Sequence, residues 1–580
     1  MINNGFHSVG ARLLRGICFS AFVLAVAAIS CGDAFAAISV PSSVSPGQVS
    51  KRFNPDETAD NALQLDVPVP SVQKQQTTDS KDKAAKTKFV LNNVAVSGAT
   101  VYNSSELEQY YKDAIGSSIS LQDAKDIAAR ITARYRNDGY ILSQAVVPAQ
   151  DVSKGELSIR VVEGYIAKVV LDGAADTPEM RESLRGYIEG IEAGRPVKMH
   201  DLERYMLLMN DLPGNQVSGL IRPSAKELGG AELVLSVNSK PFEASYSFDN
   251  RGSKYIGPWQ HVLSFGANSL LTDYDSTFMR VETSTPFEEL FGIEVGHDLL
   301  LNSMGTKLGF IYSHTRTQPG EDLKSLRIVG KSDMFEVKVS HPFVRTRSQS
   351  LSGRAVVDIR NTTTDVFSNV RLNTDKLRVV RLGGTYNMLD ALNGSDSFDA
   401  QISQGLNVFS ATDSGVARSN PIGESDFTKL NFHLSRVQPL PSRFSVLTAM
   451  SLQYAFNPLL SDEQFSIGGS DFGRAFDPSE ALGDSGISAK AELRYTELVG
   501  EKYLQSYQPY AFYDIGETWT RGAGGESKVL SSVGVGARIN LTENFSASFE
   551  AASPLVKPGN NDQTSYRHNP RLFFTLMARF

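Results

Sequence analysis

The residue types that could do chemistry in this chain do not stand at catalytic spacings. The eight histidines are scattered, with no His-Glu-x-x-His pair for zinc. Gly468-Gly-Ser470 lacks the spacing of a nucleophile elbow, and Gly522-Ala-Gly-Gly525 lacks the Lys-Ser/Thr of a phosphate loop. A formal net charge of −7 gives no basic footprint for nucleic acid. We therefore predict no catalytic site, no metal site, no cofactor and no nucleic-acid partner.

One carboxylate in an apolar stretch is the strongest candidate for a functional side chain. Asp514 lies in Phe512-Tyr-Asp-Ile-Gly516, between Tyr513 and Ile515. If this segment is a strand whose apolar face meets lipid, the carboxylate points into a pore. An arginine on a loop folded into that pore would supply a bidentate, charge-assisted partner. The chemistry expected of this residue is ion pairing, and it depends on the elements around it.

Those elements are expected to be the strands of a transmembrane β-barrel. The last ten residues place one apolar set on a single face: Leu572, Phe574, Leu576, Ala578 and Phe580. Segments 533–540 and 545–551 alternate in the same way. Period-two alternation over about ten residues, closed by a terminal Phe, is typical of such barrels. We predict that Phe574, Leu576 and Phe580 act as a barrel assembly signal.

The same alternation recurs from residue 242 to the C-terminus, with almost no helical stripes. Allowing about twenty residues for a strand and half of its two connections predicts about sixteen strands. Beyond residue 36 we find no apolar run long enough for a membrane helix, and closure into a barrel satisfies every backbone group in lipid. The expected fold class is mainly β, a C-terminal antiparallel transmembrane β-barrel preceded by two α+β domains.

Residues 1–36 have the features of a secretory signal. Two arginines precede an apolar stretch, residues 17–29, and Ala34-Phe-Ala36 fits a cleavage site. An uncleaved anchor would need a longer apolar run, and lipidation at Cys31 competes poorly with the Ala-x-Ala site. Because Cys31 and Cys18 both fall inside the signal, the mature chain is expected to lack cysteine, disulfides and thiolate metal sites.

Between signal and barrel, the sequence predicts a short helix at 46–53, which has Pro46 in its first turn, a polar tether, and two similar modules. Each module has about seventy-five residues in the order β-α-α-β-β, which indicates an internal duplication. In the first module we expect strands at 89–96, 141–148 and 156–162 and helices at 104–114, capped by Asn103 or Ser104, and 121–137. In the second we expect strands at 167–171, 217–222 and 231–237 and helices at 178–188 and 201–210.

Several strings in these segments are specific. The first module contains Tyr135-Arg-Asn-Asp-Gly-Tyr140, Ala145-Val-Val-Pro-Ala-Gln-Asp151 and Gly155-Glu-Leu-Ser-Ile-Arg-Val-Val-Glu-Gly164. The second contains Leu202-Glu-Arg204 and Asn210-Asp-Leu-Pro-Gly214, and the barrel opens with Asp249-Asn-Arg-Gly-Ser253. From about residue 46 to the C-terminus, the chain resembles two-partner secretion transporters of the hemolysin-activator type, with paired periplasmic POTRA domains and a β-barrel. The implied domains are a signal peptide (1–36), a plug helix and linker (37–87), POTRA 1 (88–163), POTRA 2 (164–240) and the barrel (241–580).

The resemblance also implies a latch inside the pore. Residues 467–476 resemble the family's long inward loop, whose tip usually reads Val-Arg-Gly-Phe or Val-Arg-Gly-Tyr. Here the tip reads Gly473, Arg474, Ala475, Phe476, and the family pattern implies that Arg474 pairs with Asp514. Ala475 enters positive φ less readily than Gly, which puts the backbone geometry of the tip in question. The alternative is that Arg474 lies on an ordinary extracellular loop and that Asp514 is solvated.

The modules are expected to capture cargo as an extended segment by β-augmentation. Candidate edge or groove residues are Val146, Val147, Leu157, Ile159 and Val161; the alternative for each is that it fills the core of its own module. A barrel of about sixteen strands encloses an aqueous channel, so we expect the inward loop and, by resemblance, the helix at 46–53 to plug it at rest.

The function expected from the residues and the resemblance together is passive export of one large unfolded exoprotein that carries an N-terminal secretion domain. The expected location is the outer membrane of a Gram-negative cell, with the POTRA domains in the periplasm. Expected partners are the exoprotein, outer-membrane lipid and lipopolysaccharide, and the barrel assembly machinery, with the transporter a monomer. An assembly factor of the same superfamily and a plain diffusion porin are the alternatives. The sequence leaves open whether the cargo is an adhesin, a hemolysin or a contact-dependent toxin, and whether the transporter activates it.

Overall fold

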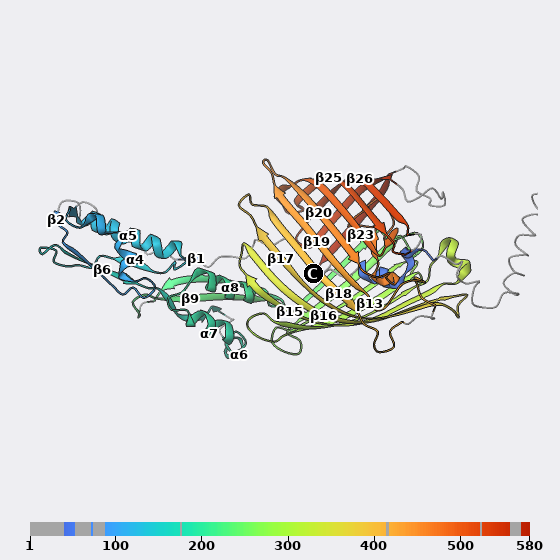
Figure 1. Cartoon of the computed structure of the whole chain (residues 1–580), viewed down its shortest axis with the longest axis horizontal. Helices are drawn as coiled ribbons and strands as arrows, with labels where there is room; N and C mark the ends of the chain where they lie inside the picture. The colour runs from blue at the N-terminus through green and yellow to red at the C-terminus, as the bar shows by residue number, and fades with distance from the viewer. Residues whose placement is uncertain are drawn as a thin grey trace, which may run out of the picture.

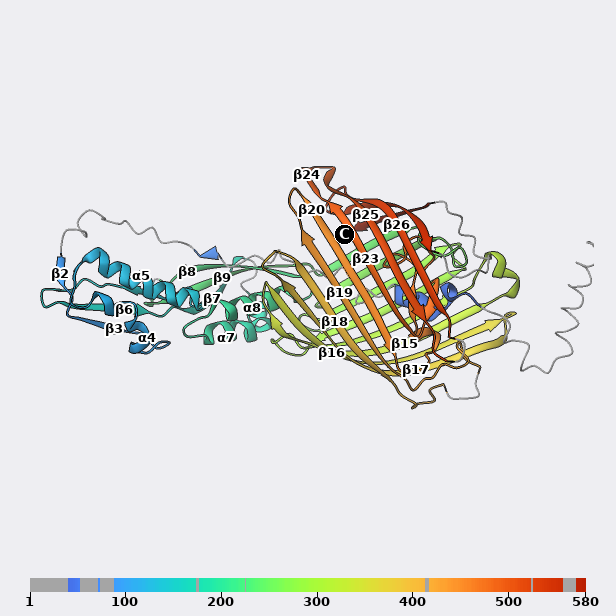
Figure 2. The same cartoon turned by 45° about the horizontal axis from the view of Figure 1, so that its top comes forward.

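The computed structural model describes residues 40–52, 71–72, 88–173, 177–224, 226–412, 417–522, 525–556 and 570–580. The predicted signal and most of the predicted tether lie outside these residues. The described chain is elongated, with two small α+β modules in a row and a large β-barrel at one end (Figure 1). A second view shows the same order of parts (Figure 2). The predicted fold class is confirmed.

The first module is a three-stranded sheet covered by one long helix. Its central strand β6 (Glu156–Val162) pairs in parallel with β3 (Asn93–Ser97) and antiparallel with β5 (Gln144–Val146). The helix α5 (Leu121–Asn137) has the predicted bounds and begins at a capping box formed by Ser120 and Asp123. Its buried stripe, from Ala124 to Tyr135, packs on the sheet. A small sheet of β2 (Lys88–Val90) and β4 (Ser118–Ser120) completes the module.

Some predicted elements of this module are shorter in the structure. The helix expected at 104–114 is α4 (Ser104–Glu108), capped by Asn103 as predicted, followed by the 3-10 turn η4 (Lys112–Ala114). The helix stops early because Tyr110 donates its backbone N–H to the carbonyl of Leu107, a tight turn that directs Tyr111 into the core. The strand expected at 89–96 is interrupted between β2 and β3, where Asn92 bonds to Gly155.

The second module repeats the strand order of the first. Its central strand β9 (Gly230–Ser239) pairs in parallel with β7 (Tyr165–Leu171) and antiparallel with β8 (Asn215–Pro223). The helix predicted at 178–188 is two helices, α6 (Pro178–Ser183) and α7 (Arg185–Ala193), because the chain bends at the fully buried Leu184. The third helix, α8 (Met199–Asn210), begins close to the predicted start. On the outer side of β8, the short strand β1 (Ser71–Val72) adds in parallel.

The second module is fixed to one rim of the barrel by side chains. Arg345 donates two hydrogen bonds of 2.7 Å to the carboxylate of Asp211, at the end of α8. Lys307 donates to the backbone carbonyl of Asp211, and Tyr274 from a barrel hairpin joins the apolar core of the module. The module therefore holds a defined position at the entrance of the barrel.

The barrel runs from β10 (Phe242–Asp249) to β28 (Arg571–Arg579), and β28 pairs back with β10 to close it. The strands between are β11 (Trp259–Asn268), β12 (Ser276–Thr285), β13 (Leu290–Leu300), β14 (Lys307–Thr317), β15 (Val329–Arg345), β16 (Gln349–Val366), β17 (Val370–Leu389), β18 (Ser395–Gly405), β19 (Thr428–Pro439), β20 (Phe444–Ala455), β23 (Ser485–Tyr495), β24 (Glu497–Glu501), β25 (Leu504–Trp519), β26 (Ser527–Asn540) and β27 (Phe545–Val556). Since β23 and β24 are two parts of one strand paired with β25, the barrel has 16 strands, as predicted. An even number returns the C-terminus to the rim that carries the modules.

The two faces of the barrel strands follow the predicted alternation. On β25, Tyr513 and Ile515 are exposed on the outer face, whereas Phe512 and Asp514 are buried on the inner face. On β28, Leu572 and Leu576 are exposed in the same way. None of the described helices combines the length and the apolar character needed to cross a membrane.

Candidate functional site in the barrel lumen

The connection from β20 to β23, residues 456–484, folds back into the barrel and is called the inward loop below. A small hairpin of β21 (Phe465–Ile467) and β22 (Ala481–Gly483) forms its two limbs. Gly468, Gly469 and Gly473 have positive φ values, the conformation that glycine adopts without a steric cost. These three glycines let the chain turn between the limbs and carry residues 473–476, the latch segment, to the barrel wall.

The structure brings Arg474 and Asp514 together. Arg474 Nε lies 3.0 Å from Asp514 Oδ2, and Nη2 lies 2.9 Å from Oδ1. The backbone N–H of Arg474 also donates to Oδ2, at 3.1 Å. Arg474 is 4% exposed and Asp514 is fully buried. This is the bidentate, charge-assisted geometry in which an arginine binds a carboxylate most strongly.

Further partners of the latch were not predicted from the sequence. Arg474 Nη1 lies 2.8 Å from a Glu492 carboxylate oxygen on β23 and 3.4 Å from one of Glu550 on β27. Its guanidinium stacks 3.4 Å from the ring centre of Phe512. Arg571 on β28 donates to the carbonyl of Ala475 at 3.1 Å. The alternation of side chains along each strand could have indicated the two glutamates as partners, since Glu492 and Glu550 each lie on the inward face of their strand.

The departure of the loop tip from the family pattern is accommodated without strain at Ala475. Positive φ occurs at Gly473 and not at Ala475, so the concern about the alanine backbone does not apply here. The methyl group of Ala475 is fully buried and packs with Phe476. Phe476 is itself 1% exposed, in an apolar cluster that includes Phe512 and Phe573 of the wall.

The predicted plug helix is α2 (Pro46–Arg52), and Phe53, its predicted last residue, lies outside the described residues. Figures 1 and 2 both draw this blue segment within the barrel, toward the end far from the modules. Val49 is fully buried against Ile256 and Leu290, which lie on the wall side. Thr317 of β14 donates to the carbonyl of Val44 just before the helix, at 2.9 Å. The helix therefore packs against the inner surface of the barrel and is not free in the lumen.

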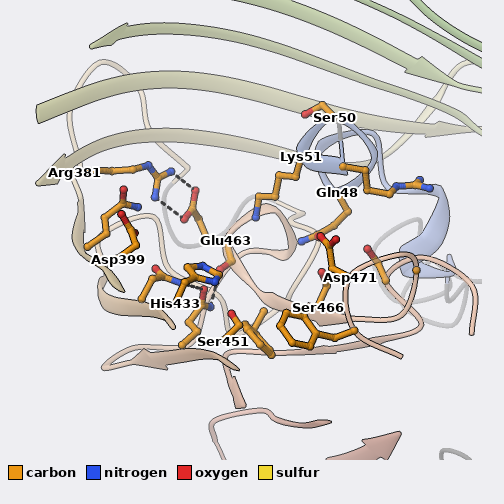
Figure 3. A pocket seen from close by; sticks show the side chains of 18 of the residues that line it. Gln48, Ser50, Lys51, Arg381, Asp399, His433, Ser451, Glu463, Ser466 and Asp471 are labelled. Atoms are coloured by element: carbon orange, nitrogen blue, oxygen red, sulfur yellow. Dashed lines mark hydrogen bonds and ion pairs between the residues drawn. The ribbon is translucent and has the colours of Figure 1, made fainter. Parts of the chain in front are cut away.

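A polar cavity of about 690 Å³ remains between α2, the inward loop and the wall (Figure 3). Charged groups of both signs line it, among them Lys51, Arg381, Asp399 and Glu463. Among the described residues, no group of three His, Cys, Asp or Glu side chains could hold a metal ion. That the whole protein has no metal site and no cofactor stays a prediction.

The candidate cargo-binding residues of the first module divide into two sets. Leu157, Ile159 and Val161 are at most 3% exposed and lie on β6, which has a partner strand on each side. The prediction of an edge or groove position is wrong for these three, because alternation shows that one face of a strand is buried and not whether its edges are free. Val146 lies on β5, an edge strand of this sheet in the described chain, and Val147 follows it.

A half-buried carboxylate fixes the end of the first module. Glu163 accepts hydrogen bonds from the backbone N–H groups of Thr100 and Val101, at 2.7 and 3.0 Å, and from the hydroxyl of Tyr135, at 2.8 Å. Burial alone would raise the pKa of Glu163, but these hydrogen bonds and the one from the Thr100 hydroxyl lower that pKa below its ordinary value. Glu163 is therefore anionic in the folded module and joins its helix to its last strand.

The predicted assembly residues lie on the closing strand. Phe574 packs against Phe248 and Trp259 across the β28–β10 seam, with ring centres 5.4 and 5.6 Å apart. Phe580 exchanges two backbone hydrogen bonds with Ala244, and Leu576 faces outward. Their role as an assembly signal remains a prediction.

Comparison with known proteins agrees with this architecture. Residues 229–539 match the family described as haemolysin secretion/activation protein ShlB/FhaC/HecB, and residues 89–164 match the ShlB-type POTRA domain. The heme/hemopexin transporter protein HuxB of Haemophilus influenzae strain 86-028NP is 24% identical over 474 residues, 80% of this chain and 82% of its own. The outer membrane transporter CdiB of Escherichia coli O6:K15:H31 is 26% identical over 487 residues, 81% of this chain and 79% of its own.

Solved structures show the same fold. CdiB from Escherichia coli superposes with a TM-score of 0.75 at 23% identity, covering 94% of this chain and all of that one. CdiB from Acinetobacter baumannii superposes with a TM-score of 0.63 at 18% identity and the same coverage. Because the family match covers more than half of the chain, the conclusion is direct: the chain belongs to the haemolysin secretion/activation protein family ShlB/FhaC/HecB.

Proposed function

We propose that this protein, an outer-membrane transporter of the two-partner secretion type by its family, exports one large exoprotein through its barrel and is closed at rest by α2 and the inward loop. The observation that carries the proposal is the buried pair of Arg474 and Asp514, which holds a loop across the lumen of a barrel wide enough for a channel. Because removing one partner of a buried pair leaves the other charge uncompensated, this pair holds the loop strongly in place.

The role of the latch is tested by secretion. Arg474→Ala should abolish release of the cargo while the barrel still inserts and keeps its heat-resistant migration. The cargo itself is found by comparing culture supernatants with and without the gene. Secretion at the wild-type level in the variant would contradict the latch. No catalytic role is proposed, and energy for export would come from folding of the cargo outside the cell.

The modules would capture the cargo at a sheet edge by β-augmentation. Support comes from β8, whose edge accepts an extended segment of this same chain, β1, in parallel. The short edge strand β5 with Val146 is a second candidate edge. The relative HuxB is named a heme/hemopexin transporter protein; for this chain we propose only a large exoprotein with an N-terminal secretion domain as cargo.

The remaining parts of the proposal concern assembly and organisation. The transporter would act as a monomer surrounded by lipopolysaccharide-containing membrane, inserted by the barrel assembly machinery that reads the last strand. We also propose the following domains: a signal (1–36), plug and linker (37–87), POTRA domains (88–163 and 164–240) and barrel (241–580). Added protease should leave the modules intact in whole cells and cleave them once the outer membrane has been permeabilised; cleavage of the modules in intact cells would contradict this arrangement.

A further inference from the structure

The plug helix is seated on the first part of the inward loop, residues 461–464, which we call the loop root. Gln48 donates from Nε2 to the carbonyl of Ser461 at 2.5 Å and lies 3.5 Å from the carbonyl of Gln464. Just before the helix, Ser45 Oγ lies 3.5 Å from Asp462 Oδ1. The seat of the helix is therefore in the loop that carries the latch, but at a different place along it.

The loop root has its own anchor on the barrel wall. Glu463 is 1% exposed and pairs with Arg381 of β17 and Lys429 of β19, each at 2.7 Å. Its backbone carbonyl accepts hydrogen bonds from Lys429 and from Gln453 of β20, both at 2.9 Å. Figure 3 shows the paired Arg381 and Glu463, with Lys51 of α2 extending toward the same carboxylate. The side chains that bind Glu463 thus come from β17, β19 and β20, whereas those that bind the latch segment come from β23, β25, β27 and β28.

The fit between helix and root leaves no room for an added side chain. A Cβ at Gly47 would overlap the carboxylate of Asp462. That carboxylate is 1% exposed and accepts a 2.5 Å hydrogen bond from Thr362 of β16, so it has little freedom to move aside. The position of the root therefore decides whether α2 can occupy its site.

We propose that Glu463 is the positioning residue of the plug: it fixes the loop root that seats α2, so closure of the pore depends on the root and secretion on the latch. The proposal rests on the proposed role of α2 as a plug. Its physical basis is that two anchors on separate sectors of the wall hold one loop. Breaking the anchor at Arg474 leaves the interactions of Glu463 with Arg381, Lys429 and Gln453 in place, so the latch can be released without unseating the helix.

The test is conductance of the purified full-length protein in planar bilayers. Glu463→Gln leaves Lys429 without its carboxylate, Gly47→Ala blocks seating although Ala favours the helix itself, and Gln48→Ala removes the bond to Ser461. Glu463→Gln and Gln48→Ala should each raise the fraction of time spent open by about tenfold, the factor that corresponds to losing one charge-assisted or well-formed hydrogen bond. Gly47→Ala should raise this fraction at least as much, because its Cβ would overlap the Asp462 carboxylate. Ser50→Ala is the matched control on the same helix, because its hydroxyl bonds only to the carbonyl of Gly47 among the bonds of the described chain, and it should conduct like the wild type.

A local readout separates unseating from general loosening of the barrel. In the mature chain, which is predicted to lack cysteine, a cysteine at Ser50 should react faster with a thiol reagent when Glu463→Gln is present, whereas one at the fully buried Ala475 of the latch segment should not. In the Arg474→Ala variant, the cysteine in the latch segment should react faster and the one at Ser50 should not. Conductance should stay near the wild-type value. If Glu463→Gln does not assemble, Gly47→Ala still tests the proposal, because it changes neither Glu463 nor the residues of the wall that bind it.

The outcomes distinguish the inference from the function on which it rests. If deletion of residues 42–52 opens the pore but Gly47→Ala and Glu463→Gln stay closed, the helix is a plug and the root is not its seat. If the deletion also leaves conductance unchanged, the plug itself is refuted. If Arg474→Ala opens the pore as fully as Glu463→Gln, the two anchors are not separate and the division of roles is wrong.

Discussion

The ion pair of the latch allows a prediction whose sign can be worked out residue by residue. Arg474→Ala removes both side-chain bonds to Asp514, which is fully buried and keeps only the 3.2 Å bond from Ser532 and the backbone N–H of residue 474. Glu492 keeps Arg494 at 2.6 Å and Arg538 at 2.7 Å, and Glu550 keeps Arg251 at 3.2 Å. The cost is therefore concentrated on Asp514.

The magnitude follows from leaving one buried charge unpaired. Breaking such a pair costs about 3–5 kcal/mol, and the lower figure suits a lumen that holds water. About 3 kcal/mol lowers the ratio of docked to undocked loop by about a hundredfold. In Asp514→Asn, Arg474 still has Glu492 and Glu550, so this single change should cost only about 1–2 kcal/mol, the value of charge-assisted bonds partly replaced.

The double variant distinguishes a direct ion pair from two independent effects. In the Arg474→Ala background, Asp514→Asn removes the orphaned charge, so it should restore docking instead of weakening it. Docking is measured by the reactivity of a cysteine at the fully buried Ala475, in a background from which Cys18 and Cys31 have been removed. If Asp514→Asn weakens docking equally in both backgrounds, the two residues act independently and the pair is not what holds the loop.

Three further predictions concern other parts of the molecule. Because folding lowers the pKa of Glu163, its contribution to the stability of the first module is present above the ordinary value of 4.5 and lost as pH falls through the folded pKa. Glu163→Gln should therefore cost about 1 kcal/mol of unfolding free energy at pH 7 and weaken the fall of that free energy at acid pH, measured by urea unfolding followed by the fluorescence of the module. An unchanged fall at acid pH would contradict this. Asp211→Asn breaks the partly exposed ion pair with Arg345, so it should cost at most about 1 kcal/mol of stability. It should nevertheless widen the distribution of distances between a spin label on the second module and one on the barrel rim. A narrow, unchanged distribution would show that the apolar contact alone fixes the module. Deletion of Phe580 removes both backbone bonds to Ala244 and should reduce the amount of heat-modifiable barrel in the membrane, whereas normal amounts would show that the last rung is dispensable for assembly.

Much of this architecture follows from local pattern. Period-two alternation over many strands predicted the barrel and placed Asp514 inward, because a strand shows each side chain to one of two faces. The capping boxes at Asn103 and Ser120 fixed the helix starts of the first module for the same local reason. The bends at Leu184 and after Glu108 were not predicted, since they serve burial of Leu184 and Tyr111 in cores that assemble only in the folded module.

What alternation could not predict is which strands are neighbours. Leu157, Ile159 and Val161 have the pattern of any half-buried strand, and their central position in the sheet depends on pairing with β3 and β5, far apart in sequence. The same limit hid the partners of Arg474. Glu492 and Glu550 point inward by parity, but whether they meet the loop tip depends on the register of β23, β25 and β27.

The shared carboxylate of Glu550 explains how the loop can move while the wall stays closed. The β10–β28 seam is short: it pairs five positions, from Ser245 to Asp249, next to the exchange between Ala244 and Phe580. The side chain of Asn250 extends it by bonding to the carbonyl of Leu572 and the N–H of Phe574, at 2.9 and 2.8 Å. Next to it, Arg251 binds the Glu550 oxygen that Arg474 does not use. When Arg474 leaves, Glu550 keeps Arg251 and the hydroxyl of Tyr510, so no buried charge is orphaned at the seam. Loss of the Arg474 contact therefore leaves the short β10–β28 ladder and its neighbouring ion pair intact.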